Sequence, residues 1–95
     1  MKNLEGWKLG DAVNELLNWC CPCCHNGPIE MEVKPYTGPW SLVMTYNNGR
    51  RQTGAPVFRC SRCHSFLDVG QLLGKYGYGL TMNCGSRELR LRRLA

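Results

Sequence analysis

The sequence predicts a small α+β zinc-binding domain, in which a three-stranded antiparallel sheet is flanked by helices and held by one four-cysteine zinc site. Three observations lead to this prediction: two distant Cys-x-x-Cys pairs, a helix-period segment before the first pair, and alternating segments between the pairs. A chain of 95 residues has room for one ordinary core, which a metal commonly supplements at this size. We therefore assign residues 1–85 to a single zinc-binding domain and residues 86–95 to a basic C-terminal tail or short helix.

The first expected element is a helix over residues 9–19. Asp11 is its expected N-cap, because a carboxylate there can accept from amides two or three residues further on. The helix should end before Pro22, which has no amide hydrogen. Apolar side chains recur at the spacing of one helix face, namely Val13, Leu16, Leu17 and Cys20.

Three strands are expected between the cysteine pairs. Residues 29–33, "IEMEV", alternate apolar and charged side chains, which is typical of a half-buried strand. Residues 40–46, "WSLVMTY", form a second strand, and the Asn48-Gly49 pair after it is a strong hairpin signal. Residues 56–60, "PVFRC", form a short third strand that leads into the second pair.

A second helix is expected over residues 65–73, with Gly74 as the left-handed residue beyond its C-terminus. The last ten residues, "SRELRLRRLA", fit either a short terminal helix or a frayed basic tail. Nothing in the sequence decides between these two.

The cysteine pairs predict one structural zinc ion. Two residues between thiols let the chain turn so that both sulfur atoms reach one ion at about 2.3 Å. Two such pairs complete a tetrahedron with no position for water, so the zinc would be structural rather than catalytic. Disulfides are the alternative, but the chain has seven cysteines and no secretory signal, which favours an intracellular protein with reduced thiols. The expected ligands are Cys21, Cys24, Cys60 and Cys63.

The first pair can be drawn in two registers, Cys21 with Cys24 or Cys20 with Cys23. We favour Cys21 with Cys24, because Cys20 continues the apolar face of the helix as a small buried side chain. Pro22 also suits the tight turn that would follow Cys21. Cys23 is then a spare thiol within the turn.

Other chemically capable residues are expected outside the ligand set. Cys84 is expected to be a free thiol, and His25 and His64, which directly follow the pairs, are expected beside the site rather than on the metal. No nucleophile and base pair, phosphate-binding loop or paired-carboxylate signal is present, and thiols bound to zinc are not available for attack. We therefore do not expect an enzyme.

Charge is unevenly distributed along the chain. Residues 1–49 carry a net charge of −2 and residues 50–95 carry +7. A basic half can meet acidic peptides or nucleic acid. No run approaches the roughly 18 apolar residues of a membrane span, so no membrane partner is expected.

Two classes of partner follow from this charge. An amphipathic helical peptide needs an apolar groove with a basic rim, for which the candidates are Phe66, Leu72 and Leu73 with Arg50, Arg51, Arg59 and Arg62. Nucleic acid needs cations for phosphates and aromatic rings for bases, for which the candidates are Arg87, Arg90, Arg92 and Arg93 with Tyr76 and Tyr78. The chain is expected to be a monomer or to self-associate weakly through an apolar patch built from Trp7, Trp19 and Trp40.

Three stretches resemble a known family. "AVNELLNWCCPC", "WSLVMTYNNGRRQTGAPVFRCSRC" and "CHSFLDVGQLLGKYGY" are similar to the helix, strands, turn and aromatic connection in the zinc repeat of the papillomavirus early proteins, especially early protein six. The likeness covers roughly residues 9–78. With room for one repeat, the chain is similar to the single-repeat forms associated with birds.

The resemblance implies a function as well as a fold. It implies a viral early, oncoprotein-like adaptor that acts in the host nucleus and cytoplasm. Such an adaptor binds leucine-rich acidic helical peptides of host proteins, redirects ubiquitin ligases and blocks transcriptional coactivators. The alternative is a basic zinc ribbon that binds nucleic acid and regulates transcription.

Overall fold

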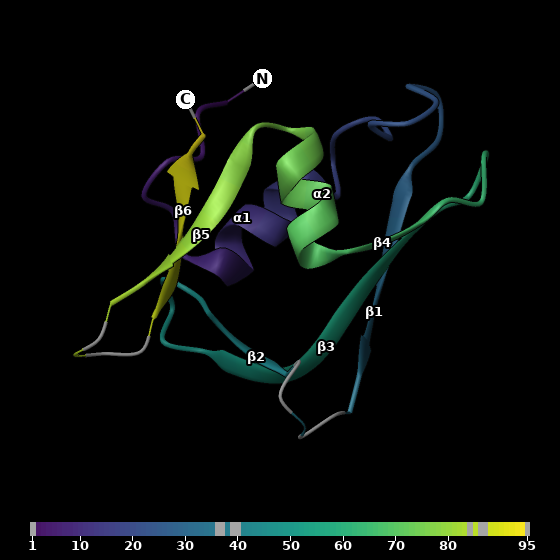
Figure 1. Cartoon of the computed structure of the whole chain (residues 1–95). Helices are drawn as coiled ribbons and strands as arrows, with labels where there is room; N and C mark the ends of the chain where they lie inside the picture. Colours follow the sequence, from purple (N-terminus) through teal and green to yellow (C-terminus); the bar gives the residue numbers. More distant parts are fainter. Residues whose placement is uncertain (1, 36–37, 39–40, 84, 86–87, 95) are drawn as a thin grey trace.

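The computed structural model of the chain describes residues 2–35, 38, 41–83, 85 and 88–94. These residues form an α+β arrangement of antiparallel strands and two helices (Figure 1), as the sequence predicts. The sheet is larger than the expected three strands, because it has four, and two further strands form a separate hairpin. The elements are α1 (Leu9–Leu16), β1 (Ile29–Lys34), β2 (Leu42–Thr45), β3 (Arg51–Cys60), β4 (Phe66–Asp68), α2 (Val69–Lys75), β5 (Tyr78–Met82) and β6 (Leu89–Arg93).

Helix α1 is shorter than the sequence suggests and begins differently. It ends at Leu16, and Lys8 is its N-cap without a side-chain hydrogen bond, so the assignment of Asp11 as the N-cap is wrong. Asp11 lies in the first turn, where a negative charge still favours the helix. Its carboxylate accepts a hydrogen bond from the Asn47 amide at 2.9 Å, which ties α1 to the β2–β3 turn.

Strand β3 is the centre of the larger sheet. Strand β1 pairs along one edge of β3, from Ile29 opposite Cys60 to Lys34 opposite Ala55. The registers place β2 and β4 one after the other along the opposite edge, with β2 against the first part of β3 and β4 against the last. The expected third strand, residues 56–60, is thus only the second half of β3, and the predicted Asn48-Gly49 hairpin joins β2 to it.

Pro56 lies in the middle of this central strand, where proline is ordinarily excluded. The Tyr46 amide donates to Arg50 and the Cys60 amide donates to Ser65, so the even-numbered residues of β3 direct their amides toward β2 and β4. Position 56 falls between the last partner of β2 and the first hydrogen-bonded partner of β4. The missing amide hydrogen of Pro56 therefore faces a gap between two strands and costs no ladder hydrogen bond.

The second helix begins four residues later than predicted, because residues 66–68 pair with β3 as strand β4. Asp68 caps α2 by accepting from the Gln71 amide at 2.7 Å, while the Gln71 side chain accepts from the Asp68 amide at 3.0 Å. Gly74 remains inside α2, and Gly77 beyond the C-cap adopts the left-handed conformation at φ 84°. The prediction for Gly74 is therefore wrong by three residues.

The C-terminal segment is a strand, and both expectations for it, a helix or a frayed tail, are wrong for residues 89–93. Strand β6 pairs with β5, and Leu91 is buried in the core. The Gly6 amide donates to the Leu91 carbonyl at 2.8 Å, and the Leu91 amide donates to the Trp7 carbonyl at 3.0 Å. The two ends of the chain therefore stabilise each other through backbone hydrogen bonds.

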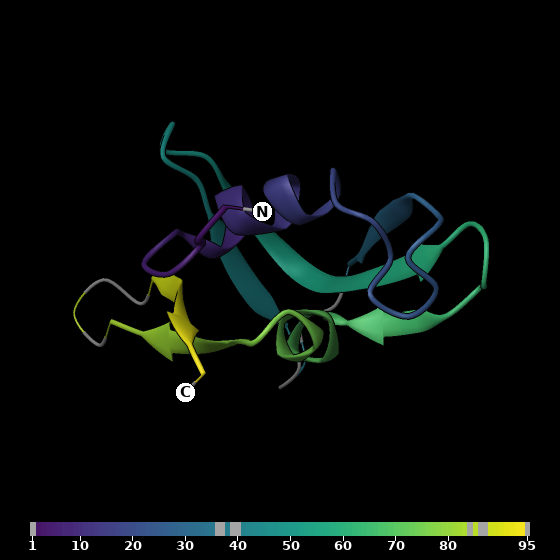
Figure 2. The same ribbon diagram turned by 90° about the horizontal axis from the view of Figure 1, so that it is seen from above.

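The core fills the space between the helices and the strands; α1 and α2 lie on the same side of β3 in Figure 1 and flank the strand only when the molecule is seen from above (Figure 2). No helix in the described part of the chain is long and apolar enough to cross a membrane. Trp40, Cys84 and Arg87, which the sequence singled out, lie outside the described residues. The fully buried side chains of the core include Leu4, Leu9, Val13, Leu16, Met44, Phe58, Leu72, Leu73 and Leu91.

Candidate metal centre

The first knuckle lies between α1 and β1. The His25 amide donates to the Cys21 carbonyl at 2.9 Å, which closes a tight turn around Pro22. The Cys23 amide donates to Cys21 Sγ at 3.3 Å. His25 adopts a left-handed conformation at φ 61°, which turns the chain away from the sulfur atoms toward β1.

The second knuckle lies at the end of β3 and repeats this geometry. The His64 amide donates to the Cys60 carbonyl at 3.1 Å, and the Arg62 amide donates to Cys60 Sγ at 3.3 Å. His64 has φ 60°, the counterpart of His25 in the first knuckle. Both histidines thus serve as the left-handed residue that ends a Cys-x-x-Cys turn, a backbone role that the sequence analysis did not foresee.

The two knuckles bring four sulfur atoms together. Cys21 Sγ lies 3.8 Å from Cys63 Sγ, and Cys24 Sγ lies 3.6 Å from Cys60 Sγ. All four sulfur atoms lie within 4.8 Å of one another. A disulfide needs about 2.05 Å between sulfur atoms, whereas a tetrahedral metal with bonds of about 2.3 Å separates its sulfur ligands by roughly 3.8 Å. The spacing fits four thiolates around one metal ion.

Gly27 allows the knuckles to meet. A Cβ at this position would lie 2.6 Å from Cys60 Sγ and 2.7 Å from Arg62 Cγ. The Gly27 carbonyl also accepts from the Cys21 amide at 3.2 Å. A side chain here would push the first knuckle away from the second. The glycine in "CHNGP" is therefore required by the packing of the site, and not only by the turn.

Burial and hydrogen bonding shift the pKa values of the ligand thiols in different directions. Burial raises the pKa of the Cys21 thiol to about 12. Hydrogen bonds from the Asn26 and Gly27 amides lower the pKa of Cys24 to about 6. The Ser65 side chain, with Oγ 3.1 Å from Cys63 Sγ, lowers the pKa of Cys63. A bound cation would supply the positive charge that stabilises a buried Cys21 thiolate.

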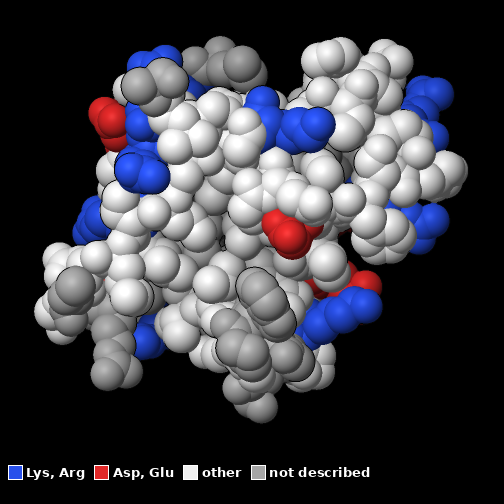
Figure 3. Space-filling view, viewed as in Figure 1, with Lys and Arg blue, Asp and Glu red and all other residues white. Residues whose placement is uncertain are grey.

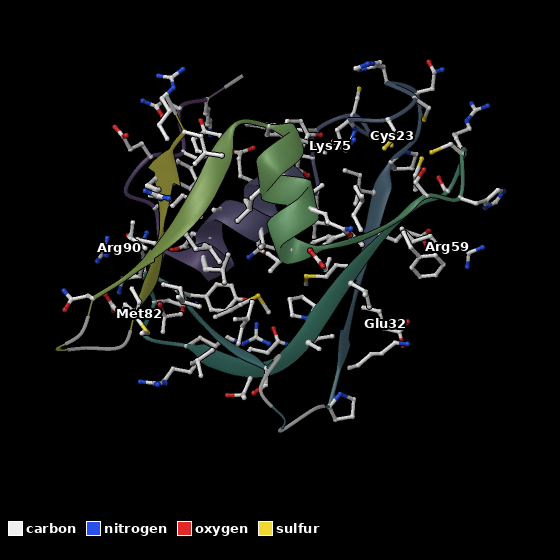
Figure 4. All side chains as sticks on the ribbon, in the orientation of Figure 1. Cys23, Glu32, Arg59, Lys75, Met82 and Arg90 are labelled. Carbon is white, nitrogen blue, oxygen red and sulfur yellow. The ribbon has the colours of Figure 1, made fainter. Side chains whose placement is uncertain are left out.

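The other cysteines of the first cluster lie apart from this group. Cys20 and Cys23 are both exposed. The prediction that Cys20 is buried on the helix face is wrong, because α1 ends at Leu16 and the chain has left the helix before Cys20. Figure 4 shows Cys23 at the knuckle end of the molecule, the same end as Arg59. The sulfur cluster therefore contains Cys21 and Cys24 and leaves out Cys20 and Cys23.

An aromatic pair connects the first knuckle to α2. The Tyr76 hydroxyl donates to the Cys20 carbonyl, and the Tyr76 and Trp19 rings meet edge to face with centroids 5.0 Å apart. Burial raises the pKa of Tyr76 to about 12. Tyr78 is buried, and its hydroxyl accepts from the Leu4 amide at 3.0 Å. These contacts hold both tyrosines within the fold. Because Tyr78 is buried, its ring is not available to stack on bases.

The candidate groove residues do not lie as the sequence suggested. Leu72 and Leu73 are fully buried in the core, whereas Phe66 is 63% exposed. The expected basic rim is divided, since Arg50 and Arg51 lie at the start of β3 and Arg59 and Arg62 at its end. The two pairs are separated by a strand roughly 30 Å long, so they do not surround one groove.

A groove of about 440 Å³ lies instead beside Pro56, where β3 has no partner between β2 and β4. Its lining is mostly apolar and comes from β2, β3, β5, the end of β4 and the start of α2. A separate hollow of about 160 Å³ shares Val57 with this groove and is also lined by Glu30, Met31, Glu32, Arg59 and Phe66. The residues that line the main groove are Leu42, Ala55, Pro56, Val57, Asp68, Val69, Gly70 and Leu80.

Basic side chains gather at two ends of the face shown in Figure 3, over the β5–β6 hairpin and at the knuckle end. On the hairpin, the register places Arg90 and Arg92 on the face opposite Leu91. Arg90 is partly neutralised, because its guanidinium lies 3.1 Å from the Glu88 carboxylate and donates to the Gly6 carbonyl at 2.9 Å. Arg92 is the exposed cation of this face.

Comparison with known proteins adds no further constraint, since no protein-family model, curated protein or solved structure matches the chain.

Proposed function

We propose that Cys21, Cys24, Cys60 and Cys63 hold one structural zinc ion. The support is the spacing of the four sulfur atoms, 3.6 and 3.8 Å within the two closest pairs, together with the chemistry of the donors. Four thiolates form a closed tetrahedral set that suits zinc and leaves no position for water or substrate. When bound, the ion supplies a charge that neutralises the thiolates and links the end of β3 to the entry of β1.

This zinc centre would position a protein-binding surface rather than catalyse a reaction. Cys60 ends the strand that lines the groove, and Ile29, which faces Cys60, begins β1. A bound ion therefore fixes the strands on which Val57 and Pro56 are presented. In zinc-finger peptides such an ion contributes about 10–16 kcal/mol of apparent binding energy, which is enough to decide whether a domain of this size folds.

The partner that the groove favours is an amphipathic helical peptide of another protein. Its lining accepts leucine-sized side chains, and helices bind such grooves through apolar residues at intervals of three and four. Lys34 and Arg59 share the face of the sheet that carries Val57 with Glu30 and Glu32, and acidic residues of the peptide would pair with the two cations. Asp68 also borders the groove, but its carboxylate already accepts from the Gln71 amide.

Together with the resemblance to the papillomavirus early proteins, these features support an intracellular, host-directed adaptor of the single-repeat type. In this proposal, the groove captures a leucine-rich helix of a ubiquitin ligase or of a transcriptional coactivator. Redirected ubiquitination or simple blockade of the captured protein would follow.

A peptide array tests this proposal. The zinc-loaded chain should bind acidic Leu-x-x-Leu-Leu peptides, and Leu80→Gln should weaken binding about tenfold, because a buried leucine contact contributes about 1.5–3 kcal/mol. Met82→Gln is the matched control, since Met82 lies on the same strand but is 59% exposed and does not line the groove. Equal effects of the two substitutions would contradict the assignment of the groove.

Nucleic-acid binding is the second candidate, supported by Arg90 and Arg92 on one face of the β5–β6 hairpin. Nucleic-acid binding would have an affinity that falls steeply as the salt concentration rises, because phosphates release counterions when the protein binds them. Titration of single- and double-stranded nucleic acid in rising salt, beside the peptide array, separates the two. A steep salt dependence without a peptide signal would replace the peptide-binding proposal.

A further inference from the structure

The outer edge of β1 carries backbone groups without partners. The Ser61 amide donates to the Pro28 carbonyl at 3.3 Å, which fixes the alternation of the β1–β3 ladder. In an antiparallel pair every second residue faces its partner strand. The amides and carbonyls of Glu30 and Glu32 therefore bond β3, while those of Met31 and Val33 point the other way.

No described element lies against that outer edge. Strand β1 pairs with β3 alone, and no hydrogen bond in the described part of the chain uses the Met31 or Val33 backbone groups. Both side chains are half-buried on the core face of the sheet. A row of unpaired amides and carbonyls is a template on which another strand can pair.

Two carboxylates beside this edge, on a face that they share with Lys34, have no ion-pair partner among the described residues. They belong to Glu30 and Glu32, which are exposed on one face of β1. Arg59 lies opposite Glu30 in the ladder but is directed elsewhere. Its guanidinium lies 5.5 Å from the centre of the Phe66 ring and 3.5 Å from His64 Nδ1. Figure 4 shows Glu32 and Arg59 as separate projections from this side of the sheet.

The same charges disfavour one of the two registers in which β1 could pair with itself. Two antiparallel registers pair five residues of β1 with β1 of a second copy through the outward amides. One register sets Glu30 opposite Glu32 of the second copy twice, whereas the other sets Glu32 opposite its own counterpart but Glu30 opposite Lys34 twice. Like charges directly opposite each other destabilise a sheet. A strand that brings cations to these positions has no such conflict.

We propose that the β1 edge binds an extended segment of another protein with Lys or Arg at alternate positions and an apolar residue between them. The guest strand would exchange backbone hydrogen bonds with Met31 and Val33. Its two cations would lie opposite Glu30 and Glu32, and its apolar side chain would lie beside Met31. This surface is distinct from the Pro56 groove and does not depend on what that groove binds.

The test is amide hydrogen exchange of the zinc-loaded full chain, followed by NMR with and without the peptide Thr-Lys-Val-Lys-Thr. At saturation, exchange at Met31 and Val33 should slow about tenfold or more, because amides in a ladder are protected. Exchange at Glu30 and Glu32, whose amides already bond β3, should change little. Unchanged exchange at Met31 and Val33 would overturn the proposal.

Two matched pairs of reagents separate strand addition from simple charge attraction. The double substitution Glu30→Lys and Glu32→Lys should weaken the basic peptide about tenfold and strengthen Thr-Glu-Val-Glu-Thr by a similar factor. Val33→Pro removes an outward amide without removing a bond to β3 and should also abolish protection at Met31. Binding that survives Val33→Pro would contradict strand addition. A free chain that already protects Met31 and Val33 as a dimer would assign the edge to a second copy instead.

Discussion

The two ends of β3 are held by different kinds of interaction. Near the start of the strand, Met44 of β2 packs in a fully buried interior with Leu16, Leu72 and Leu91 from both helices and from β6. Near its end, the buried side chains of Ile29 and Phe58 adjoin the sulfur atoms of the two knuckles. The first end is stabilised by burial of apolar surface, and at the second we propose a cation between the thiolates. A small domain can therefore supplement its apolar core with a metal ion at one end of a strand.

Removing a metal ligand should have the largest effect on folding. Cys60→Ser takes away a thiolate and the acceptor of the Arg62 amide at once, so we expect the chain to lose zinc and to unfold. A chelator should do the same to the unsubstituted chain. Circular dichroism and metal analysis measure both effects, with Cys23→Ser as a control at an exposed cysteine. A chain that stays fully folded in chelator would show that the apolar end suffices alone.

A cavity at the apolar end should test whether the two ends fold as one unit. Leu72 is fully buried, and Leu72→Ala should cost about 2–5 kcal/mol of unfolding free energy. If the ion binds only the folded chain, the apparent zinc affinity should fall by the same free energy. Competition with a chelator dye measures that affinity. An unchanged affinity beside a lowered melting temperature would mean that the knuckles assemble independently of the core.

A methyl group at Gly27 should disturb the metal end alone. Gly27→Ala places a Cβ against Cys60 Sγ, so the knuckles must move apart at a cost of about 1–3 kcal/mol. Zinc affinity should fall accordingly, as chelator competition would measure. Gly70→Ala is a suitable control, because the nearest atom to a Cβ there is Asp68 Oδ1 at 3.4 Å. Similar losses in the two variants would contradict the steric role of Gly27.

The smallest effect is expected at the spare cysteines. Cys20 and Cys23 are exposed and lie outside the sulfur cluster, so replacing both with Ser should leave zinc stoichiometry unchanged and stability within about 0.5 kcal/mol. Metal analysis and thermal melting measure this outcome. Loss of zinc from the double variant would mean that the first knuckle binds in the other register.

Much of the fold could be predicted from patterns local to one element. The alternation of residues 29–33 and the Asn48-Gly49 turn indicated β1 and the β2–β3 hairpin, because each is decided by neighbouring residues. The spacing of the cysteines indicated which thiols could meet, and the sulfur cluster consists of those four. The turn geometry at His25 and His64 could have been suspected from the repeated Cys-x-x-Cys-His sequence.

The remaining elements depend on partners that are distant in the sequence. Residues 66–68 look helical in isolation but pair with β3, and Leu89 and Leu91 form a strand because β5 and Trp7 lie beside them. Their alternation with arginine was a strand signal that the basic charge obscured. The Pro56 groove could not be predicted, since it arises where two strands on the same edge of β3 fail to meet.

The central claim is that one metal ion joins the two knuckles at the end of β3. X-ray absorption at the zinc edge of the purified, zinc-loaded chain tests it most directly. The account predicts one zinc per chain with four sulfur neighbours at about 2.3 Å and no nitrogen or oxygen neighbour. A first shell that contains histidine nitrogen or water, or fewer than four sulfur atoms, would contradict it.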